Sequence, residues 1–567
     1  MPDIRIAVID WIVLIGYLAG IAAVGIIVSR RVRDTSHYFL GARGFNKWLM
    51  IGQSFGTGTH AEMPVSLAGA VYATGASAIW YQWKNLFATP FYWIMAPLFR
   101  RYRRTTMAEA VEDRYGPWMG AIYTVFALGF LCINMASMLK GAAKVISQAV
   151  GGNIPVNGIV IAMTLIFMLY SFVGGLVAAA WTDFLQGFLI IALSFMLIPL
   201  GWGDVGGIRG MRQVLESYRF SLAAPEGIGL WFILMLTVNG LVGMFAMPHL
   251  LAAVGTGKDE QACRTGFMYG NFVKRFCTVG WALVGLMVAV LVVKGTLGVH
   301  ALGEPEEAFG FACRHLLFPG GVGLMVASVL AANMAACSAF MVDCGALFTR
   351  SFYRKYLVPG ERDAHYLWVG RVSGVLITLA AVLYALFLIR RVLYSFLLTE
   401  TMATFVGVSV FGGVLWRRAT RWGALASLIA ALSANFGLYA LKGQRLDHWD
   451  PNVFLGALSS GLVVFIVASL LTSRESTARL DSFYARLETP SEESAADSTV
   501  LPPTPEEVRN WAEAGRQLIL VHLFHPIRGA SGVGFLRAYR HDLTGFAKGW
   551  LVVIALISLM WMILHVG

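Results

Sequence analysis

The chain has 567 residues, of which 57% are hydrophobic, 13% aromatic and only 13% charged, against about 25% charged residues in soluble domains. Together with a mean hydropathy of +0.67, this composition excludes an ordinary soluble protein and indicates a polytopic membrane protein. The formal net charge of +12 does not indicate a nucleic-acid partner, because the basic residues lie in short clusters between apolar segments, where they orient helices in the membrane.

Apolar stretches of about 20 residues, the length that crosses a bilayer as a helix, predict an all-α polytopic membrane protein with about fourteen transmembrane helices. The first stretch, residues 9–28, is long enough to span and leads into a basic run, so we interpret it as a transmembrane helix rather than a cleavable signal peptide. The other spans are expected near residues 46–72, 76–99, 117–149, 155–175, 178–202, 229–255, 268–295, 319–350, 366–389, 391–416, 422–441, 452–472 and 547–566.

Clusters of Lys and Arg follow alternate predicted helices, at residues 30–33, 100–104, 274–275, 350–355 and 417–421. Because cytoplasmic loops carry an excess of Lys and Arg, we assign all these clusters to the cytoplasmic side. The assignment predicts a multi-pass protein of the plasma (inner) membrane with its N- and C-termini both outside. Arg390 and Arg391 break the alternation within a very short outer loop, and we give them no weight.

One long polar segment, residues 473–546, lies between the last two predicted spans. It contains the stretches "SEESAADST" and "LPPTPEE", which are acidic, Ser-rich and Pro-rich. Such composition buries too little apolar surface to fold. We therefore expect a cytoplasmic, largely unstructured tail.

The stretch "SFGTGTHAEMP", residues 54–64, interrupts the second predicted span. Gly56 and Gly58 allow the backbone to leave the helix without a side-chain clash, and His60 and Glu62 add titratable groups. Non-helical backbone costs several kcal/mol in hydrocarbon unless it lines a cavity, and a carboxylate there costs at least ~2.5 kcal/mol. The stretch therefore predicts a broken helix at a polar binding site.

Other predicted spans also carry polar groups, and the seventh combines Asn239 with a breaker at Pro248 and with His249. Two interrupted helices at matching positions of two halves are typical of an inverted-repeat transporter with its site at the midplane. Taken singly, each polar group is explained as well by snorkelling or by a salt bridge. Candidate substrate-binding residues are His60, Glu62, Lys140, Asn239, His249 and Glu400, with Lys144 on the same helix face as Lys140.

Signals of enzymatic chemistry are absent from the sequence. The tripeptide "HAE" does not extend to HExxH, and there is no GxSxG, Walker lysine or CxxC motif. We therefore expect no enzymatic activity and no cofactor beyond a coupling ion.

Four segments resemble the sodium:solute symporter family, which includes bacterial proline and galactose carriers: "YFLGARGFNKWLMIGQSFGTGTHAE", "VGGLVAAAWTDFLQGFLI", "AMPHLLAAVGTGKDEQACRTG" and "FMVDCGALFTRSFYRKY". The resemblance implies a LeuT-type fold with an extra N-terminal helix, a 5+5 inverted repeat, additional C-terminal helices and alternating access. It divides the chain into an N-terminal helix and basic loop, a first repeat, an outer loop, a second repeat, two additional helices, the tail and a final helix, at residues 1–45, 46–202, 203–228, 229–416, 417–472, 473–546 and 547–567.

The resemblance also implies the positions of a sodium site. In the family, backbone carbonyls and two side-chain hydroxyls bind the ion; the carbonyl positions fall here on Gly56, Thr59 and Ala332. The hydroxyl positions are occupied by Ala335 and Ala336, so the site is degenerate.

The coupling ion is therefore open between sodium and a proton. A slip that brings Ser338 into the site or the carboxylate of Asp183 would restore a sodium ligand, and Glu62 or His60 would serve proton coupling. Asp183 matches the family aspartate that helps ion release towards the cytoplasm.

These observations predict a secondary active transporter of a small polar organic solute. The alternative is a non-transporting, sensor-like member that acts as a membrane receptor or partner-binding subunit. Sensor relatives usually carry a C-terminal signalling domain, and the tail shows none. The expected partners are the solute and the lipid bilayer, with no nucleic acid and no obligatory protein partner.

The orientation is testable with tags. We expect tags at both termini to react with a membrane-impermeant reagent added to intact cells, because the basic clusters place both ends outside. A tag within residues 480–540 should react only after permeabilisation. A cytoplasmic C-terminus would contradict the assignment and point to a miscounted span within residues 366–416.

Overall fold

The computed structural model describes residues 7–565 except 30–33, 61, 151–153, 225–227, 390–391, 444–448, 493–501 and 525–532. The regular secondary structure of the described residues is helical, and strand-type pairing among them is limited to an isolated parallel bridge between Phe45 and Gly257. The basic run at 30–33, the pair Arg390 and Arg391 and most of "SEESAADST" lie outside the described residues.

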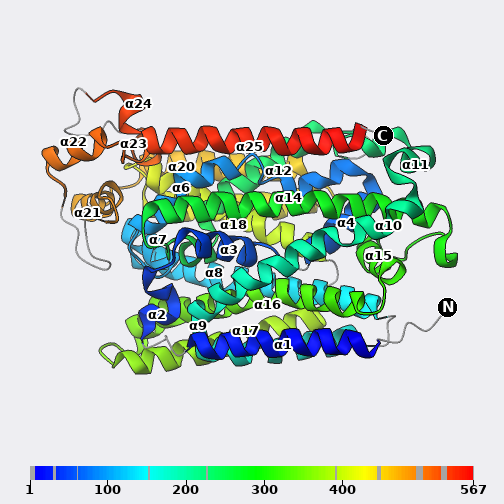
Figure 1. Ribbon diagram of the computed structural model, residues 1–567. Coiled ribbons are helices and arrows are strands. Elements are labelled where there is room, and N and C mark those ends of the chain that lie inside the picture. The colour runs from blue at the N-terminus through cyan, green and yellow to red at the C-terminus, as the bar shows by residue number, and fades with distance from the viewer. Residues whose placement is uncertain are drawn as a thin grey trace.

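Ten membrane-spanning segments in the described part are long and apolar enough to cross a bilayer as continuous helices. They run along one common direction of the bundle (Figure 1). Their helices are α1 (Val8–Ser29), α8 (Pro117–Ala149), α9 (Val156–Phe195) with α10 (Leu197–Val205), α14 (Glu260–Val293), α16 (Gly321–Phe348) with the π-helical η7 (Thr349–Leu357), α17 (Asp363–Phe387), α18 (Val392–Leu415), α19 (Arg421–Leu441), α20 (Pro451–Leu471) and α25 (Arg540–His565).

The remaining predicted spans are interrupted helices. The second is divided into α3 (Lys47–Gly58) and α4 (Glu62–Thr74), and the third and seventh are divided in the same way. The third contains η2 (Ala76–Ile79), α5 (Trp80–Trp83) and α6 (Thr89–Arg101), and the seventh contains α12 (Leu230–Gly243), η4 (Met244–Ala246) and α13 (His249–Val254). The count of fourteen spans and the 5+5 repeat stay predictions.

The predicted spans at 155–175 and 178–202 are joined through a kink in α9 at Gly175. Gly175 has φ 55°, and a Cβ there would lie 2.4 Å from the Tyr38 ring. Only glycine combines this backbone conformation with so close a contact. The chain therefore leaves helical geometry at Gly175, where the first of the two predicted spans ends.

Short helices connect these spans at the two ends of the bundle. They are α2 (Thr35–Leu40), η1 (Gly41–Arg43), α7 (Met107–Tyr115), α11 (Gly207–Val214), η3 (Ser217–Phe220), η5 (Thr296–Gly298), η6 (Pro305–Glu307) and α15 (Ala308–Leu316).

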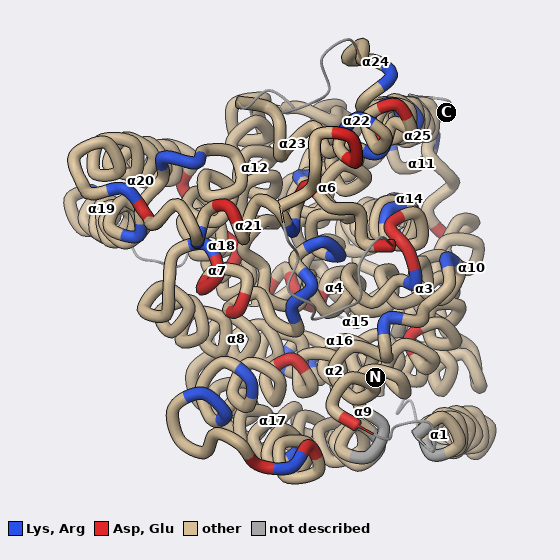
Figure 2. The backbone as a smooth tube through the Cα atoms, turned by 90° about the vertical axis from the view of Figure 1, so that its left-hand side faces the viewer, with Lys and Arg blue, Asp and Glu red and all other residues tan. Residues whose placement is uncertain are grey.

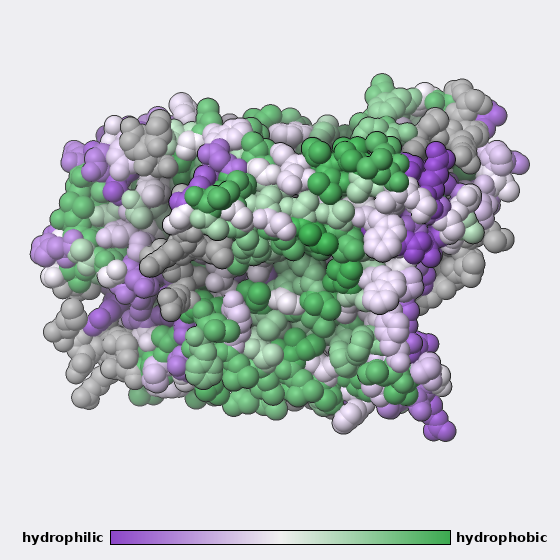
Figure 3. Space-filling model, turned by 180° about the vertical axis from the view of Figure 1, so that it is seen from behind, coloured by the Kyte–Doolittle hydropathy of each residue, from purple (hydrophilic) through white to green (hydrophobic). Residues whose placement is uncertain are grey.

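The molecular surface is arranged as expected for a bilayer. Figure 3 shows a broad apolar band around the middle of the molecule, with hydrophilic residues at both ends. Large apolar side chains such as Leu169, Trp118 and Leu551 are exposed, which is favourable where they face lipid. Charged residues gather at the end that carries the helices between residues 477 and 538, which faces the viewer in Figure 2.

The start of α1 and the end of α25 lie at the same end of the bundle (Figure 1). This arrangement agrees with two termini on one side of the membrane. Which side that is remains a prediction.

Lys274 and Arg275 lie within a helix, and not in the cytoplasmic loop to which the basic clusters assigned them. Asp259 caps α14 by accepting a hydrogen bond from the Ala262 N–H at 2.6 Å, so this helix begins eight residues before the predicted start at 268. The longer helix places Lys274 and Arg275 inside the bundle, 7% and 1% exposed.

The tail also differs from the largely unstructured segment that composition predicts. Its described part contains α21 (Thr477–Glu488), α22 (Pro505–Glu513), α23 (Ile519–His522) and α24 (Phe535–Ala538). Composition misses these helices because they are stabilised by contacts with the bundle and by local caps, such as the capping box of Thr504 and Glu507.

Two arginines at the end of α6 hold the tail. Arg101 is fully buried; it donates two hydrogen bonds to Glu260, at 2.8 and 3.0 Å, and others to the carbonyls of Leu487, Glu488 and Arg516. Arg103 donates to further tail carbonyls. Burial and the neighbouring arginines lower the pKa of Arg103 to about 10, so it remains charged at neutral pH.

We expect Arg101→Ala to lower the free energy of unfolding by about 3–5 kcal/mol, because it leaves the buried Glu260 carboxylate without its counter-charge. Thermal unfolding of the full chain in detergent measures the loss. The matched control is Arg509→Ala, whose partner Glu513 is also exposed and whose loss changes stability by less than about 0.5 kcal/mol. Equal melting temperatures for the two variants would contradict this role for Arg101.

Candidate functional site

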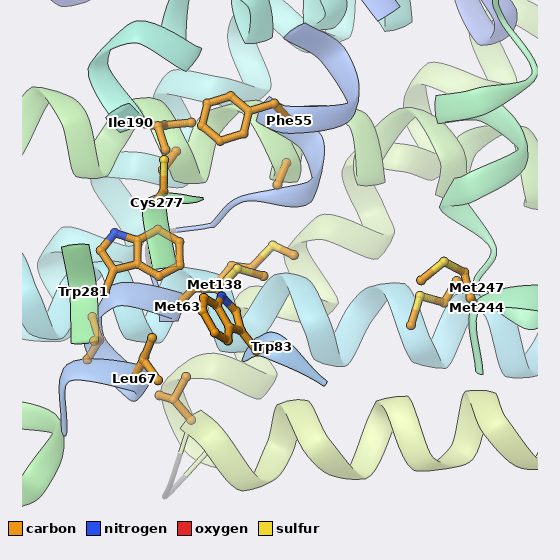
Figure 4. Close-up of a cluster of buried hydrophobic side chains, with 14 of the residues drawn as sticks. Phe55, Met63, Leu67, Trp83, Met138, Ile190, Met244, Met247, Cys277 and Trp281 are labelled. Atoms are coloured by element: carbon orange, nitrogen blue, oxygen red, sulfur yellow. The ribbon is translucent and has the colours of Figure 1, made fainter. Parts of the chain in front are cut away.

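A cavity of about 80 Å³ lies at the break between α3 and α4. Apolar packing supports it: in Figure 4, Trp83 lies beside Met63 and Met138, and Met244 and Met247 lie together. Polar lining residues come from helices far apart in the sequence and include Ser54, Thr57, His60, Asn85, Tyr92, Asn134, His249, Asn271, Lys274, Arg275 and Glu400.

The helix break is the central feature of this site. α3 ends at Gly58, and Thr59 has extended backbone with φ −124° and ψ 110°. The Thr59 N–H turns back to the Gly56 carbonyl at 3.2 Å. The carbonyls of Thr57 and Gly58 then need partners outside the helix.

His60 supplies one of these partners. Its Nε2 lies 2.8 Å from the Thr57 carbonyl, and its Nδ1 lies 2.8 Å from Glu62 Oε1. A carbonyl and a carboxylate are both acceptors. The two contacts are both hydrogen bonds only if His60 is doubly protonated or Glu62 carries the proton, so this pair is built to hold a proton.

Lys274 supplies the other partner, donating from Nζ to the Gly58 carbonyl. Gly266 and Gly270 precede it at intervals of four residues, so all three lie on one face of α14. A Cβ at Gly266 would lie 2.4 Å from Met50 Cβ, and one at Gly270 would lie 2.7 Å from the Ile51 carbonyl. These glycines let α14 pack closely against α3, which brings Lys274 to the break.

Two further charged groups line the cavity. Glu400 of α18 forms a buried ion pair with Lys84, which follows α5. Arg275 donates to the Gln82 carbonyl at 3.1 Å and interacts with the Tyr92 hydroxyl. No carboxylate in the described part of the chain forms an ion pair with Arg275.

The seventh predicted span, which is interrupted between α12 and α13, brings His249 to the same cavity. Its ring centroid lies 5.0 Å from that of Phe340 and 6.2 Å from that of Phe130. His60 packs against Phe340 from the other break, at 6.2 Å. The structure thus brings together four of the candidate residues, His60, Glu62, His249 and Glu400.

The other candidates lie elsewhere. Lys140 donates to Asn157, and Lys144 pairs with Glu306 at 2.8 Å and with Glu304 at 3.3 Å, outside the cavity. Helical spacing placed the two lysines on one face but carried no information about the loop acids that neutralise Lys144.

Asn239 is a further candidate that does not line the cavity. It is buried in α12, where its backbone carbonyl accepts a hydrogen bond from the Thr404 hydroxyl at 2.8 Å. This contact joins α12 to α18.

The positions of the family sodium site lie on α3, the break and α16. Ala335 and Ala336 are fully buried and offer methyl groups. Ser338 accepts a hydrogen bond from Ser171 at 2.6 Å. Among the side chains at the five family positions, the Thr59 hydroxyl is the one oxygen, and it is buried with no hydrogen-bond partner among the residues that the structure describes.

Asp183 of α9 contacts the same segment. It is fully buried, and its Oδ2 accepts a hydrogen bond from the Thr57 hydroxyl at 2.8 Å, while Oδ1 has no partner within the described structure. Asp183 also packs against Gly56, where a Cβ would lie 2.8 Å from its own Cβ.

The sequence analysis missed three cationic residues of this site: Lys84, Lys274 and Arg275. A signal for Lys84 was present, since it lies inside a predicted span where an ionisable residue marks function by default. Lys274 and Arg275 were assigned to a cytoplasmic loop instead, because a basic pair before an apolar run is also typical of such a loop.

A bundle of apolar helices with a polar cavity at a helix break defines a membrane carrier, since irregular backbone at membrane depth is tolerated where it lines a cavity. Comparison with known proteins identifies the family. The model of the sodium:solute symporter family matches residues 38–431. The chain belongs to this family and is a multi-pass transporter of the plasma membrane.

Individual relatives are distant but similar over most of their length. The osmoregulated proline transporter of Bacillus subtilis (strain 168) is 24% identical over 493 residues, covering 83% of this chain and 96% of the relative. The sodium/glucose cotransporter of Vibrio parahaemolyticus is 24% identical over 508 residues, covering 82% and 91%.

A solved structure of a Na⁺-coupled sialic acid symporter, in a substrate-bound outward-open state, matches with a TM-score of 0.70 at 17% identity, covering 83% of this chain and 99% of that one. The match shows that the two chains share an overall helical fold, while the 5+5 repeat stays a prediction.

The two glycines of the break differ in what surrounds them. A Cβ at Gly56 would meet Asp183, whereas one at Gly58 meets nothing within 4 Å. We expect Gly56→Ala to lower stability by about 1–3 kcal/mol through overpacking, and Gly58→Ala to leave the melting temperature nearly unchanged. Thermal unfolding of both variants in detergent tests this; a larger loss for Gly58→Ala would contradict the packing at the break.

Proposed function

We propose that the chain is a secondary active carrier that moves a small polar organic solute by alternating access about the α3–α4 break. The observation that carries the proposal is the cavity at this break, which is lined by hydrogen-bonding groups from all three interrupted spans. A membrane protein with a purely structural break has no need of so many polar groups at one point, because each is costly in hydrocarbon. Counterflow of labelled solute in liposomes separates transport from a sensor role.

Arg275 favours a solute with a carboxylate. It lines the cavity, 1% exposed, and remains charged because a guanidinium does not lose its proton in proteins. Lys84 is neutralised by Glu400, whereas Arg275 has only neutral partners within the described residues. A buried charge is stabilised by a counter-charge, and a solute carboxylate supplies one.

Thermal-shift measurements on purified protein identify the solute. The panel compares acids with their amides, such as L-proline with L-prolinamide, alongside neutral sugars and nucleosides. A solute that binds the folded state raises the melting temperature by mass action. We expect acids to raise it more than their amides, and a sugar that acts more strongly than every acid would contradict the carboxylate assignment.

Sodium binds weakly in this proposal. Sodium is a hard cation that prefers oxygen ligands, and Ala335 and Ala336 replace two hydroxyls with methyl groups. A contact with a charged group is worth about 1.5–3 kcal/mol, so losing two weakens binding by at least about 100-fold. Ser338 is already bonded to Ser171, which argues against its use as a substitute ligand.

We therefore expect uptake into proteoliposomes to persist when sodium is replaced by choline. The double variant Ala335→Ser with Ala336→Ser is the gain-of-function control and should make uptake sodium-stimulated. Asp183, Glu62 and His60 are then the groups available for proton coupling. Collapse of wild-type uptake to background in choline would show that the site still works and would overturn this expectation.

A further inference from the structure

Lys274 occupies an unusual position for a lysine in a membrane protein. Its side chain is 7% exposed, and Nζ donates to the carbonyl of Gly58, the last residue of α3. The C-terminal end of a helix carries partial negative charge on unpaired carbonyls, which favours a cation. The Lys274 ammonium provides that cation.

The opposite side of the break carries a carboxylate. Glu62 begins α4, where the positive end of the helix favours a carboxylate. Glu62 Oε1 is bonded to His60, while Oε2 has no hydrogen-bond partner among the described atoms. Lys274 therefore binds the carbonyl end of α3, and the His60–Glu62 pair lies at the facing end of α4.

We propose that Lys274 is a tethered cation, which completes the α3–α4 break in place of a diffusible ion. The inference rests on the proposed transport function and deepens it by naming the source of the positive charge. An ammonium is a compact point charge with three donors, so it can bind a carbonyl as a small cation does. In this proposal the chain carries its own cation at the break.

Two independent features act against sodium at this segment. Gly56 and Thr59, the family's carbonyl positions, flank Gly58 in the sequence, so an ion there is repelled by the Lys274 ammonium. Ala335 and Ala336 remove the hydroxyl ligands on α16. The loss of the hydroxyls and the presence of the lysine have the same consequence: the α3–α4 break does not require sodium.

The charged and titratable groups around the cavity define what a substitution changes. They are His60 and Glu62 at the break, Lys84 after α5, Tyr92 of α6, Asp183 of α9, His249 of α13, Lys274 and Arg275 of α14, and Glu400 of α18. Replacing Lys274 by a neutral residue removes one positive charge and leaves the Gly58 carbonyl without its cation. A small monovalent cation then becomes the favourable replacement.

The experiment uses sodium itself as the probe. Binding of radioactive sodium and the melting temperature are measured on the purified full chain, with choline replacing sodium at constant ionic strength. Wild type should show no sodium-specific shift. Lys274→Met, and Lys274→Gln as the variant that keeps a hydrogen-bond donor, should melt lower in choline and bind sodium at least tenfold more tightly than wild type. Lys274→Arg keeps the charge and should remain insensitive to sodium.

Lys140→Met is the matched control, because Lys140 lies on α8 outside the cavity; it should not change sodium binding. Adding Ala335→Ser and Ala336→Ser to Lys274→Gln should tighten sodium binding further. Sodium binding by wild type, or the absence of any gain in both neutral variants, overturns the proposal.

Failure of the inference and failure of the transport function give different results. If wild type takes up solute and sodium binding does not change in the Lys274 variants, the tethered cation is rejected and the proposed transport function stands. Sodium binding gained only by the neutral variants, in a protein that moves no solute of the panel, supports the tethered cation and rejects transport.

Discussion

The α3–α4 break depends on one constraint: a backbone carbonyl in the membrane must find its hydrogen-bond partner within the protein. Thr57 is bonded by the His60 ring and Gly58 by the Lys274 ammonium. The His60 ring is bonded in turn to Glu62. The polar cavity is therefore a consequence of the broken helix, and its charges are arranged around two carbonyl groups.

Much of this arrangement could be predicted from the sequence, because it depends on residues that lie close together in the chain. Glycines next to His60 and Glu62 inside an apolar span indicate a break whatever surrounds them. Lys274 could not be found this way, since its role depends on α14 packing closely against α3 through Gly266 and Gly270. A single sequence does not say which helices are neighbours.

The same limit explains why the sequence did not predict the helices of the tail or the ion-pair partner of Lys144. Lys144 is neutralised by Glu306, 162 residues away, and helical periodicity does not report such a contact. Composition predicted an unfolded tail because it counts apolar burial, whereas Arg101 and Arg103 hold that segment through its backbone carbonyls. Non-local polar contacts decided the outcome in both cases.

α14 connects these two parts of the molecule. It begins at Glu260, which the buried Arg101 holds together with the tail, and it carries Lys274 to the break. Fourteen residues separate the two positions in the sequence, about 21 Å along a helix axis. The contact at the break and the tail contact at the end of the bundle are therefore carried by one helix.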